Sequence, residues 1–139
     1  MKKVILIRFG EIFLKGKNRG FFEKTLVTNI RESLNSFGAI VEKIPGRYIV
    51  KDYNEDDEFD LVERIKKIPG IFSFAEAVSF DTSIEAMKEN AVKIMGDFVG
   101  TFKVETNRGD KNFPLTSIEI TKKAPYFYEA FYFYKYNYI

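Results

Sequence analysis

The sequence has 139 residues, 45% of them hydrophobic, which is enough for one ordinary domain or two small ones with buried cores. It contains neither cysteine nor histidine, which excludes disulfides, thiolate nucleophiles, zinc–thiolate sites and the commonest general base. The formal net charge is +2, but residues 55–60 include five acids, and without them the remaining chain carries +7. This distribution favours a basic body with one acidic spot.

The first residues predict a buried strand at 3–9. Its apolar run covers only residues 4–7 before Arg8 ends it, which is too short for the core of a signal peptide. No segment approaches the roughly 20 apolar residues that cross a bilayer. We therefore expect no membrane contact, and the absence of cysteine favours a cytoplasmic protein.

A long helix is predicted next, from about residue 19 to residue 37. Gly38 follows it and suits the left-handed conformation that ends many helices. Two short β-prone runs come after it, at 40–44 and 48–51, and a proline-glycine pair predicts the turn between them. The helix is indicated by apolar residues at helical spacing, namely Phe22, Leu26, Ile30, Leu34 and Phe37.

A second helix is predicted to begin with Asp56 or Asp57 as its cap. A proline-glycine pair at 69–70 ends it, and a β-prone run covers 71–80. The resulting order is β-α-β-β-α-β, which predicts an α+β fold of the ferredoxin-like type, an arrangement that hosts many functions. The apolar face of the second helix is predicted to hold Phe59, Val62 and Ile65.

A smaller second unit is predicted to follow, with the boundary near residues 76–82. Thr82 with Glu85 fits a capping box at the start of a third helix. A strand is predicted at 101–106, and a second capping box at residues 116–119 opens a helix that Pro125 must stop. The stripe of the third helix is Ile84, Met87, Ala91 and Ile94.

The last segment, 126–139, differs from the rest of the chain because nine of its residues are aromatic. From Tyr132 onward the alternation of side chains predicts a strand with two aromatic faces, and such an edge strand seeks a partner. We therefore expect a homodimer in which each tail packs on or pairs with its mate.

Two basic segments are candidates for binding RNA phosphates. The first, at 8–19, includes a glycine that lets backbone approach a phosphate, but it lacks the spacing of a nucleotide-binding P-loop. The second, at 102–114, is a short alternating strand that leads into a basic loop. Two lysines at the end of the last predicted helix extend the set. The candidates are Lys15, Lys17, Arg19, Lys103, Arg108, Lys111, Lys122 and Lys123.

Each candidate also has a simpler interpretation. The basic loops are also consistent with ordinary solvated loops, and the two lysines of the last helix with partners for its negative C-terminal end. The acids at 55–60 do not match a calcium loop and more simply favour a helix N-terminus. Several phenylalanines offer stacking surfaces for bases, but their spacing is more typical of core: Phe21, Phe22, Phe37, Phe72 and Phe74.

The two basic segments are similar to those of a known family. The runs are Arg8-Phe9-Gly10-Glu11-Ile12-x-Leu14-Lys15-Gly16-x-Asn18-Arg19 and Phe102-Lys103-Val104-x-Thr106-x-Arg108-x-x-Lys111-x-Phe113-Pro114. In this order they resemble the tRNA 4-thiouridine synthetases, sulfurtransferases that also supply sulfur for the thiazole of thiamine. The resemblance covers roughly residues 1–123.

The resemblance implies an N-terminal ferredoxin-like domain at 1–78, an incomplete α/β THUMP domain at 79–125 that binds RNA, and an atypical aromatic tail at 126–139. It implies tRNA as the partner, bound mainly through shape and phosphate charge. In the family a further domain, which the sequence is expected to lack, uses ATP and Mg²⁺ to adenylate the uridine, and a cysteine-bearing sulfur-donor protein or domain delivers sulfur. This chain alone is expected to be catalytically inactive. The alternative is a non-catalytic ferredoxin-like interaction or regulatory module that self-associates through its tail.

Overall fold

The structure, a computed structural model, describes residues 2–10, 16–44, 46–80, 83–97, 99–100, 106, 112–123 and 135–138. The chain divides into two compact units, with the boundary between Ala77 and Val78. Residues 3–77 and 134–139 form the first, which we call the sheet unit. Residues 1–2 and 78–133 form the second, which we call the helical unit.

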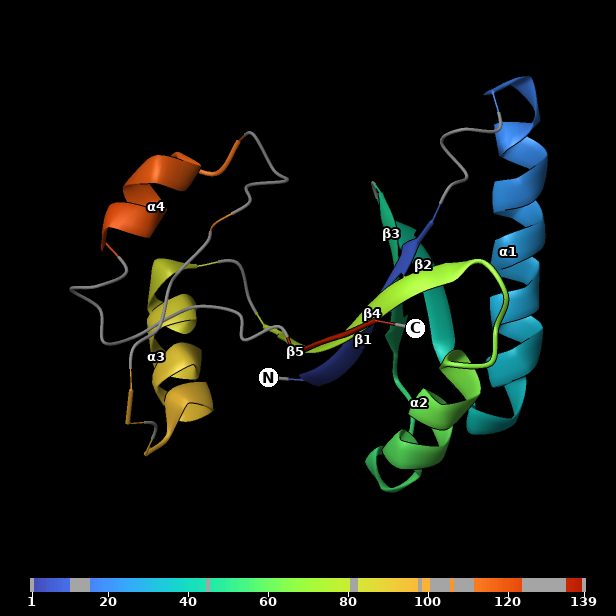
Figure 1. The fold of residues 1–139 in the computed structure, drawn as a ribbon. Coiled ribbons are helices and arrows are strands. Elements are labelled where there is room, and N and C mark those ends of the chain that lie inside the picture. Colours follow the sequence, from blue (N-terminus) through green and yellow to red (C-terminus); the bar gives the residue numbers. More distant parts are fainter. Residues whose placement is uncertain are drawn as a thin grey trace. The chain divides into compact units, whose positions relative to one another are not determined.

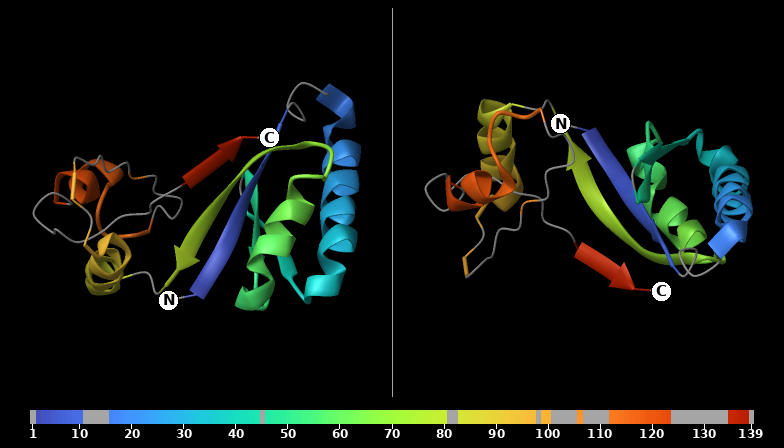
Figure 2. Two further views of the ribbon diagram at one scale, coloured as in Figure 1. Left: turned by 60° about the horizontal axis from the view of Figure 1, so that its bottom comes forward. Right: turned by 90° about the horizontal axis from the view of Figure 1, so that it is seen from above.

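The sheet unit has the predicted α+β architecture. Its strands lie in the order β2-β3-β1-β4-β5, and the pairings of β1 with β3, β2 with β3 and β4 with β5 are antiparallel. Helices α1 and α2 cover one face of this sheet (Figures 1 and 2). The elements confirm the order β-α-β-β-α-β and are β1 Lys2–Phe9, α1 Arg19–Leu34, β2 Ile40–Ile44, β3 Arg47–Lys51, α2 Glu58–Ile65, β4 Ile71–Ser79 and, later in the chain, β5 Lys135–Tyr138.

The core lies between this sheet and its two helices. Alternate residues of β1 are buried because successive side chains of a strand point to opposite faces. The register places Ile5 opposite Val50 and Ile7 opposite Tyr48, which continues the same apolar face into β3. Helix α1 buries a stripe with four-residue spacing against it. The most deeply buried members are Ile5, Ile7, Ile30, Leu34, Tyr48, Val50, Leu61 and Ile65.

The predicted end of the first helix is confirmed. Helix α1 ends at Leu34 and continues as a single 3-10 turn, Asn35–Phe37. Gly38 then adopts φ 64°, and its N–H donates to the carbonyl of Asn35. A side chain at Gly38 would be strained in this left-handed conformation, so glycine defines where the helix stops.

The phenylalanines were predicted mostly as core, and this was wrong for several of them. Phe74 is buried, but Phe21, Phe22 and Phe72 are exposed. Phe59, predicted on the apolar face of the second helix, is 75% exposed, and Leu61 joins Val62 and Ile65 as the buried stripe instead. At 100° per residue, Phe59 lies about 110° from the centre of that stripe.

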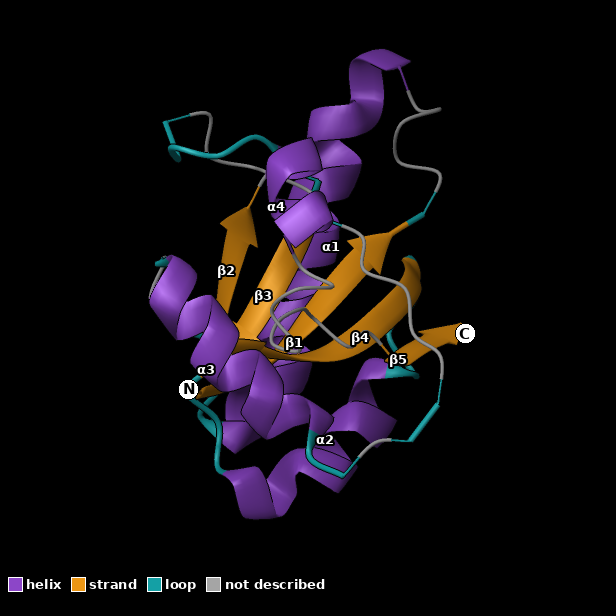
Figure 3. Cartoon of the chain, turned by 90° about the vertical axis from the view of Figure 1, so that its left-hand side faces the viewer, coloured by secondary structure: helices purple, strands orange, loops and turns teal. Residues whose placement is uncertain are grey.

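The aromatic tail contributes β5, the outer strand of the sheet. Its register with β4 places Ser73 opposite Tyr138 and Ala75 opposite Tyr136. The tail was expected to present an unpaired edge, whereas this segment pairs with a strand of the same chain (Figure 3). The homodimer through the tail stays a prediction.

The helical unit contains α3, Ile84–Met95, and α4, Ser117–Lys123. The capping box at 116–119 is confirmed, because Glu119 N–H donates to Thr116 Oγ1 at 3.3 Å and Thr116 N–H donates to Glu119 Oε2 at 2.7 Å. The predicted Thr82 cap was wrong: Ser83 is the N-cap of α3 and accepts from the N–H of Ala86. The strand predicted at 101–106 lies outside the described residues except for Thr106.

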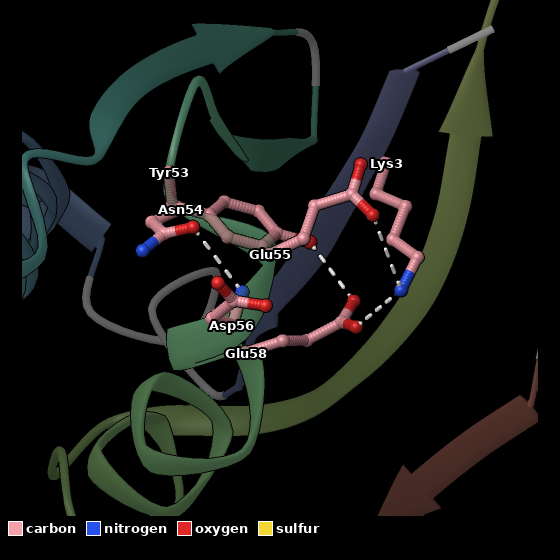
Figure 4. Close-up of polar contacts among 6 residues, drawn as sticks. All are labelled: Lys3, Tyr53, Asn54, Glu55, Asp56 and Glu58. Carbon is pink, nitrogen blue, oxygen red and sulfur yellow. Dashed lines mark hydrogen bonds and ion pairs between the residues drawn. The ribbon is translucent and has the colours of Figure 1, made fainter.

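A polar network ties the start of β1 to the start of α2 (Figure 4). Lys3 Nζ donates to Glu58 Oε2 at 2.6 Å and lies 3.7 Å from Glu55 Oε2. The buried Tyr53 hydroxyl donates to Glu58 Oε1 at 3.1 Å, and Asn54 Oδ1 accepts from the N–H of Asp56. Asp57 does occupy the N-cap of α2, but its side chain forms no capping hydrogen bond within the described part of the chain.

The acids at 55–60 therefore serve the fold. Negative side chains near a helix N-terminus are stabilised by the partial positive charge of its free N–H groups. Lys3 compensates Glu58 directly, and this hydrogen bond is the main cause that raises the pKa of Lys3. Burial, followed by the charge of Glu58, raises the pKa of Tyr53 well above its ordinary value.

Replacing Ile30 with alanine should destabilise the sheet unit by about 2–5 kcal/mol, because the side chain is fully buried and its removal leaves a cavity. Thr28→Ala, on the exposed side of the same helix, is the matched control and should change the free energy of unfolding by less than about 0.5 kcal/mol. Urea unfolding followed by circular dichroism measures both. Equal effects of the two variants would contradict the assigned helix face.

The raised pKa of Tyr53 predicts a loss of stability at high pH. Unfolded tyrosine ionises near pH 10, whereas folded Tyr53 stays neutral to higher pH, so its contribution is complete below about pH 10 and falls as the pH rises further. The urea midpoint should therefore decrease above about pH 10, and Tyr53→Phe should make that decrease shallower. Lys3, whose pKa is also raised, adds a loss of the same sign. Identical slopes for parent and variant would show that Tyr53 does not cause the effect.

Candidate nucleic-acid interface

The structure describes only some of the candidate RNA-binding residues. Lys17 and Arg19 are exposed at the beginning of α1, and Lys122 is exposed in the last turn of α4. Lys123 is also in α4, but its side chain lies outside the described residues. The rest of the set stays a prediction because it lies outside the described residues, namely Lys15, Lys103, Arg108 and Lys111.

The topology places further cations at the same end of the sheet unit as Lys17 and Arg19. Strand β3 runs antiparallel to β1, with Ile7 opposite Tyr48, so the last residues of β1 meet the first residues of β3. Helix α1 starts at this same end of the sheet unit (Figure 1). A hydrogen bond from Gly10 N–H to the carbonyl of Gly70 adds the start of β4. We call this end the basic end and define it by Arg8, Lys17, Arg19, Lys24 and Arg47.

Buried contacts fix the first turns of α1 at the basic end. The Tyr48 hydroxyl donates to the carbonyl of Glu23 at 3.3 Å. The rings of Tyr48 and Phe9 pack together, with their centroids 5.4 Å apart. Burial is the main cause that raises the pKa of Tyr48, so its hydroxyl remains a donor to a higher pH than that of an ordinary tyrosine. The helix start is therefore held by strands β1 and β3.

Among the described residues, the first acid that follows this helix start, Glu23, is paired. Glu23 forms an ion pair with Lys43 at 3.0 Å, and its side chain is only 14% exposed. The first turn, which begins with Arg19 and ends with Phe22, contains no acid. The N-cap residue Asn18 makes no side-chain capping bond among the described residues. This arrangement leaves a positive potential at the surface, which suits a polyanion.

The opposite end of the sheet unit has the opposite charge. Chain segment 52–60, which connects β3 to α2 and includes the α2 start, carries six acids, and Lys3 contacts two of them, Glu55 and Glu58. Strand β1 spans the two ends, and its eight residues extend about 23 Å. This separation exceeds the Debye length of about 8 Å at physiological salt, so the acids do little to cancel the field at the basic end.

A metal was the other reading of the acidic segment. Within the described residues, no group of three or more acidic side chains is arranged to hold a metal ion. The contacts with Lys3 and the position at a helix N-terminus account for where the segment lies. None of the helices in the described ranges is both long and apolar enough to cross a bilayer.

Sequence reasoning missed part of the basic end. Arg8 was included in the basic segment 8–19 but was not named among the candidate residues, and Arg47 lies in a strand that was predicted to begin one residue later. Lys24 was assigned to no site. Arg8 and Arg47 are separated by nearly forty positions, and only the antiparallel register brings them together. The hairpin itself was predicted, so pairing its second strand with the first would have been the usable signal.

Several known proteins are similar to this chain in sequence or in fold. Residues 4–75 match the family model described as the ThiI ferredoxin-like domain. A probable tRNA sulfurtransferase of Acetivibrio thermocellus is 40% identical over 130 residues, which cover 88% of this chain and 33% of that protein. The corresponding protein of Caldanaerobacter subterraneus is 45% identical over 126 residues, covering 89% and 33%. This chain thus spans about a third of the length of these curated relatives.

Two solved structures are also similar. A crystal structure of a 4-thiouridine synthetase–RNA complex with bound ATP has a TM-score of 0.71 at 29% identity and is matched over 92% of this chain and 33% of its own. The crystal structure of PH1313 from Pyrococcus horikoshii has a TM-score of 0.69 at 31% identity, over 91% and 44%. The family match covers more than half of this chain and coincides with the β-α-β-β-α-β elements of the sheet unit. The chain therefore belongs to the family of the ThiI ferredoxin-like domain.

Proposed function

We propose that this chain binds tRNA and is the RNA-binding part of a tRNA sulfurtransferase that makes 4-thiouridine. The observation that carries the proposal is the separation of charge in the sheet unit, where Arg8, Lys17, Arg19, Lys24 and Arg47 share one end and the acids share the other. Cations fixed at one end of a rigid sheet and helix are suited to contact several phosphates at once.

The relatives support the choice of RNA among polyanions. Two similar relatives bear the name probable tRNA sulfurtransferase, and one similar solved structure contains a 4-thiouridine synthetase with RNA. Double-stranded RNA is recognised mainly by shape and by contacts to phosphates and 2′-hydroxyls. The basic end therefore requires no base-specific side chains to orient a folded tRNA.

The helical unit is proposed to be part of a THUMP domain that extends the RNA-binding surface. Its second basic segment includes Lys103, Arg108 and Lys111, and Lys122 and Lys123 lie at the end of α4. Arginine and lysine side chains on such a loop supply phosphate contacts.

The catalytic steps, sulfur delivery and activation by ATP, are proposed to belong to other domains or proteins. Sulfur delivery through a persulfide needs a thiol, and the sequence has no cysteine, so we propose a sulfur-donor protein or domain as a further partner. The sequence also lacks a P-loop pattern, and ATP and Mg²⁺ are assigned to parts of the relatives that this chain does not span. Sulfur supply for thiamine and a cytoplasmic location remain part of the same proposal.

The proposal predicts salt-sensitive binding of folded tRNA that depends on the basic end. Lys17→Ala combined with Arg19→Ala should weaken binding by on the order of tenfold or more and reduce the slope of log Kd against log salt by about two, because about two phosphate contacts are lost. The thermal midpoint should stay nearly unchanged because both side chains are exposed. Filter binding over a salt series measures the affinity.

Lys51→Ala is the control, because Lys51 pairs with Glu42 and lies at the end of β3 nearest the acidic segment. Its Kd should match that of the parent. Arg108→Ala with Lys111→Ala tests the second basic segment in the same titration. If the variant at residues 17 and 19 bound tRNA as tightly as the Lys51 variant, the basic end would not be the interface.

The alternative function, self-association through the tail, is favoured by one observation. Strand β5, Lys135–Tyr138, pairs with the edge of β4. The β5 strand of a second copy could take the same place beside β4, so that two copies exchange their tails. Deleting residues 126–139 should then convert a dimer into a monomer. Sedimentation velocity measures this change, and a monomeric parent chain at high micromolar concentration would reject the dimer.

A further inference from the structure

We infer that Phe21 is a stacking platform for an unpaired RNA base at the basic end. The inference rests on the proposed RNA-binding function and adds the kind of RNA that this end takes. Phe21 is 70% exposed, an unusual position for a large aromatic side chain in a helix whose other face is fully buried.

The helix geometry explains why Phe21 does not contribute to the core. Leu26, Ile30 and Leu34 define the buried face of α1. At 100° per residue, Phe21 lies about 180° from the centre of that face. Phe22 lies at the margin, 39% exposed, and holds the neighbouring ring edge-on, with centroids 5.8 Å apart and an interplanar angle of 81°. Phe22 thereby contacts the Phe21 ring, while the Phe21 side chain stays accessible.

Exposed cations lie near Phe21 on both sides along the chain. Lys24 follows it by three residues, a spacing at which side chains are neighbours on a helix surface, and Lys17 lies just before Asn18, the N-cap of α1. Both lysines are exposed. Thr25 and Thr28, on the exposed side, return their hydroxyls to backbone carbonyls of this helix. An aromatic ring between cations combines stacking with attraction for the backbone, as in proteins that bind single-stranded nucleic acid.

The same domain contains a matched contrast. Phe59 is 75% exposed in the first turn of α2, but its neighbours along the chain are Glu58 and Asp60. A negative surface repels a phosphate backbone, so a similarly exposed phenylalanine at that position is not expected to bind RNA. Comparing Phe21 with Phe59 therefore distinguishes the effect of the neighbouring charges on RNA binding from the effect of exposure alone.

The test uses the full chain and two RNA probes: a fully paired hairpin and the same hairpin with a short unpaired overhang. The parent should prefer the overhang by on the order of tenfold, the range expected for stacking one base on an aromatic ring. Phe21→Leu keeps an apolar side chain but removes the ring, and it should abolish the preference without weakening binding of the paired hairpin. Phe21→Tyr and Phe59→Ala should both keep the preference.

The outcomes distinguish this inference from the proposed function. If neither probe bound, the RNA-binding function and the stacking platform would both be rejected. If the paired hairpin bound but the parent showed no preference, or if Phe21→Leu retained it, only the stacking platform would be rejected. A thermal midpoint measured for each variant shows whether the fold is intact, and the exposure of Phe21 predicts little change.

Discussion

The packing of one face of α1 against strands β1 and β3 is the constraint on which the rest of the sheet unit depends. Leu26, Ile30 and Leu34 are buried only if the helix runs along the sheet, and the Tyr48 hydroxyl fixes its early turns through the carbonyl of Glu23. This placement decides where the chain segment before the helix must lie. It also decides which residues point away from the core, because the opposite face of the helix is exposed at Phe21, Thr25 and Thr28.

Charge separation follows from the same topology. The crossover through α1 begins at one end of the sheet, and the crossover through α2 begins at the other. The start of α1 carries cations and the start of α2 carries acids, so two helix beginnings of opposite charge are kept about 23 Å apart by β1. Lys3, bound to Glu58, secures the acidic end to the sheet, which removes that acid from the field felt by an approaching polyanion.

Much of the fold was predictable from periodicity and from turn residues. The four-residue spacing of Leu26, Ile30 and Leu34, the stop at Gly38 and the β-α-β-β-α-β order all follow from local patterns, and each agrees with the structure. Phe59 and Phe21 were misassigned because the hydrophobicity of a residue alone does not show on which side of its helix the residue lies. The centre of a buried stripe has to be known before a residue can be placed on or off it.

The candidate interface was less predictable for a different reason. Lys17 and Arg19 were found because they belong to one short basic segment of the sequence, whereas Arg8 and Arg47 are brought together only by strand register, which depends on long-range pairing. Likewise, nothing local indicated that β5 would pair with β4, because the aromatic tail is compatible with any strand edge. Local patterns in the sequence predict the individual helices and strands well. A surface, however, combines residues of several elements that come together only in the folded chain.

Backbone amide hydrogen exchange of the full chain, measured with and without tRNA, tests the central claim most directly. If the basic end is the interface, tRNA should slow exchange in residues 16–24 and around Arg47, and leave residues 52–60 unchanged. Slowing confined to residues 52–60, or spread equally over both ends, would contradict the account, because it would mean that the separation of charge does not determine where RNA binds.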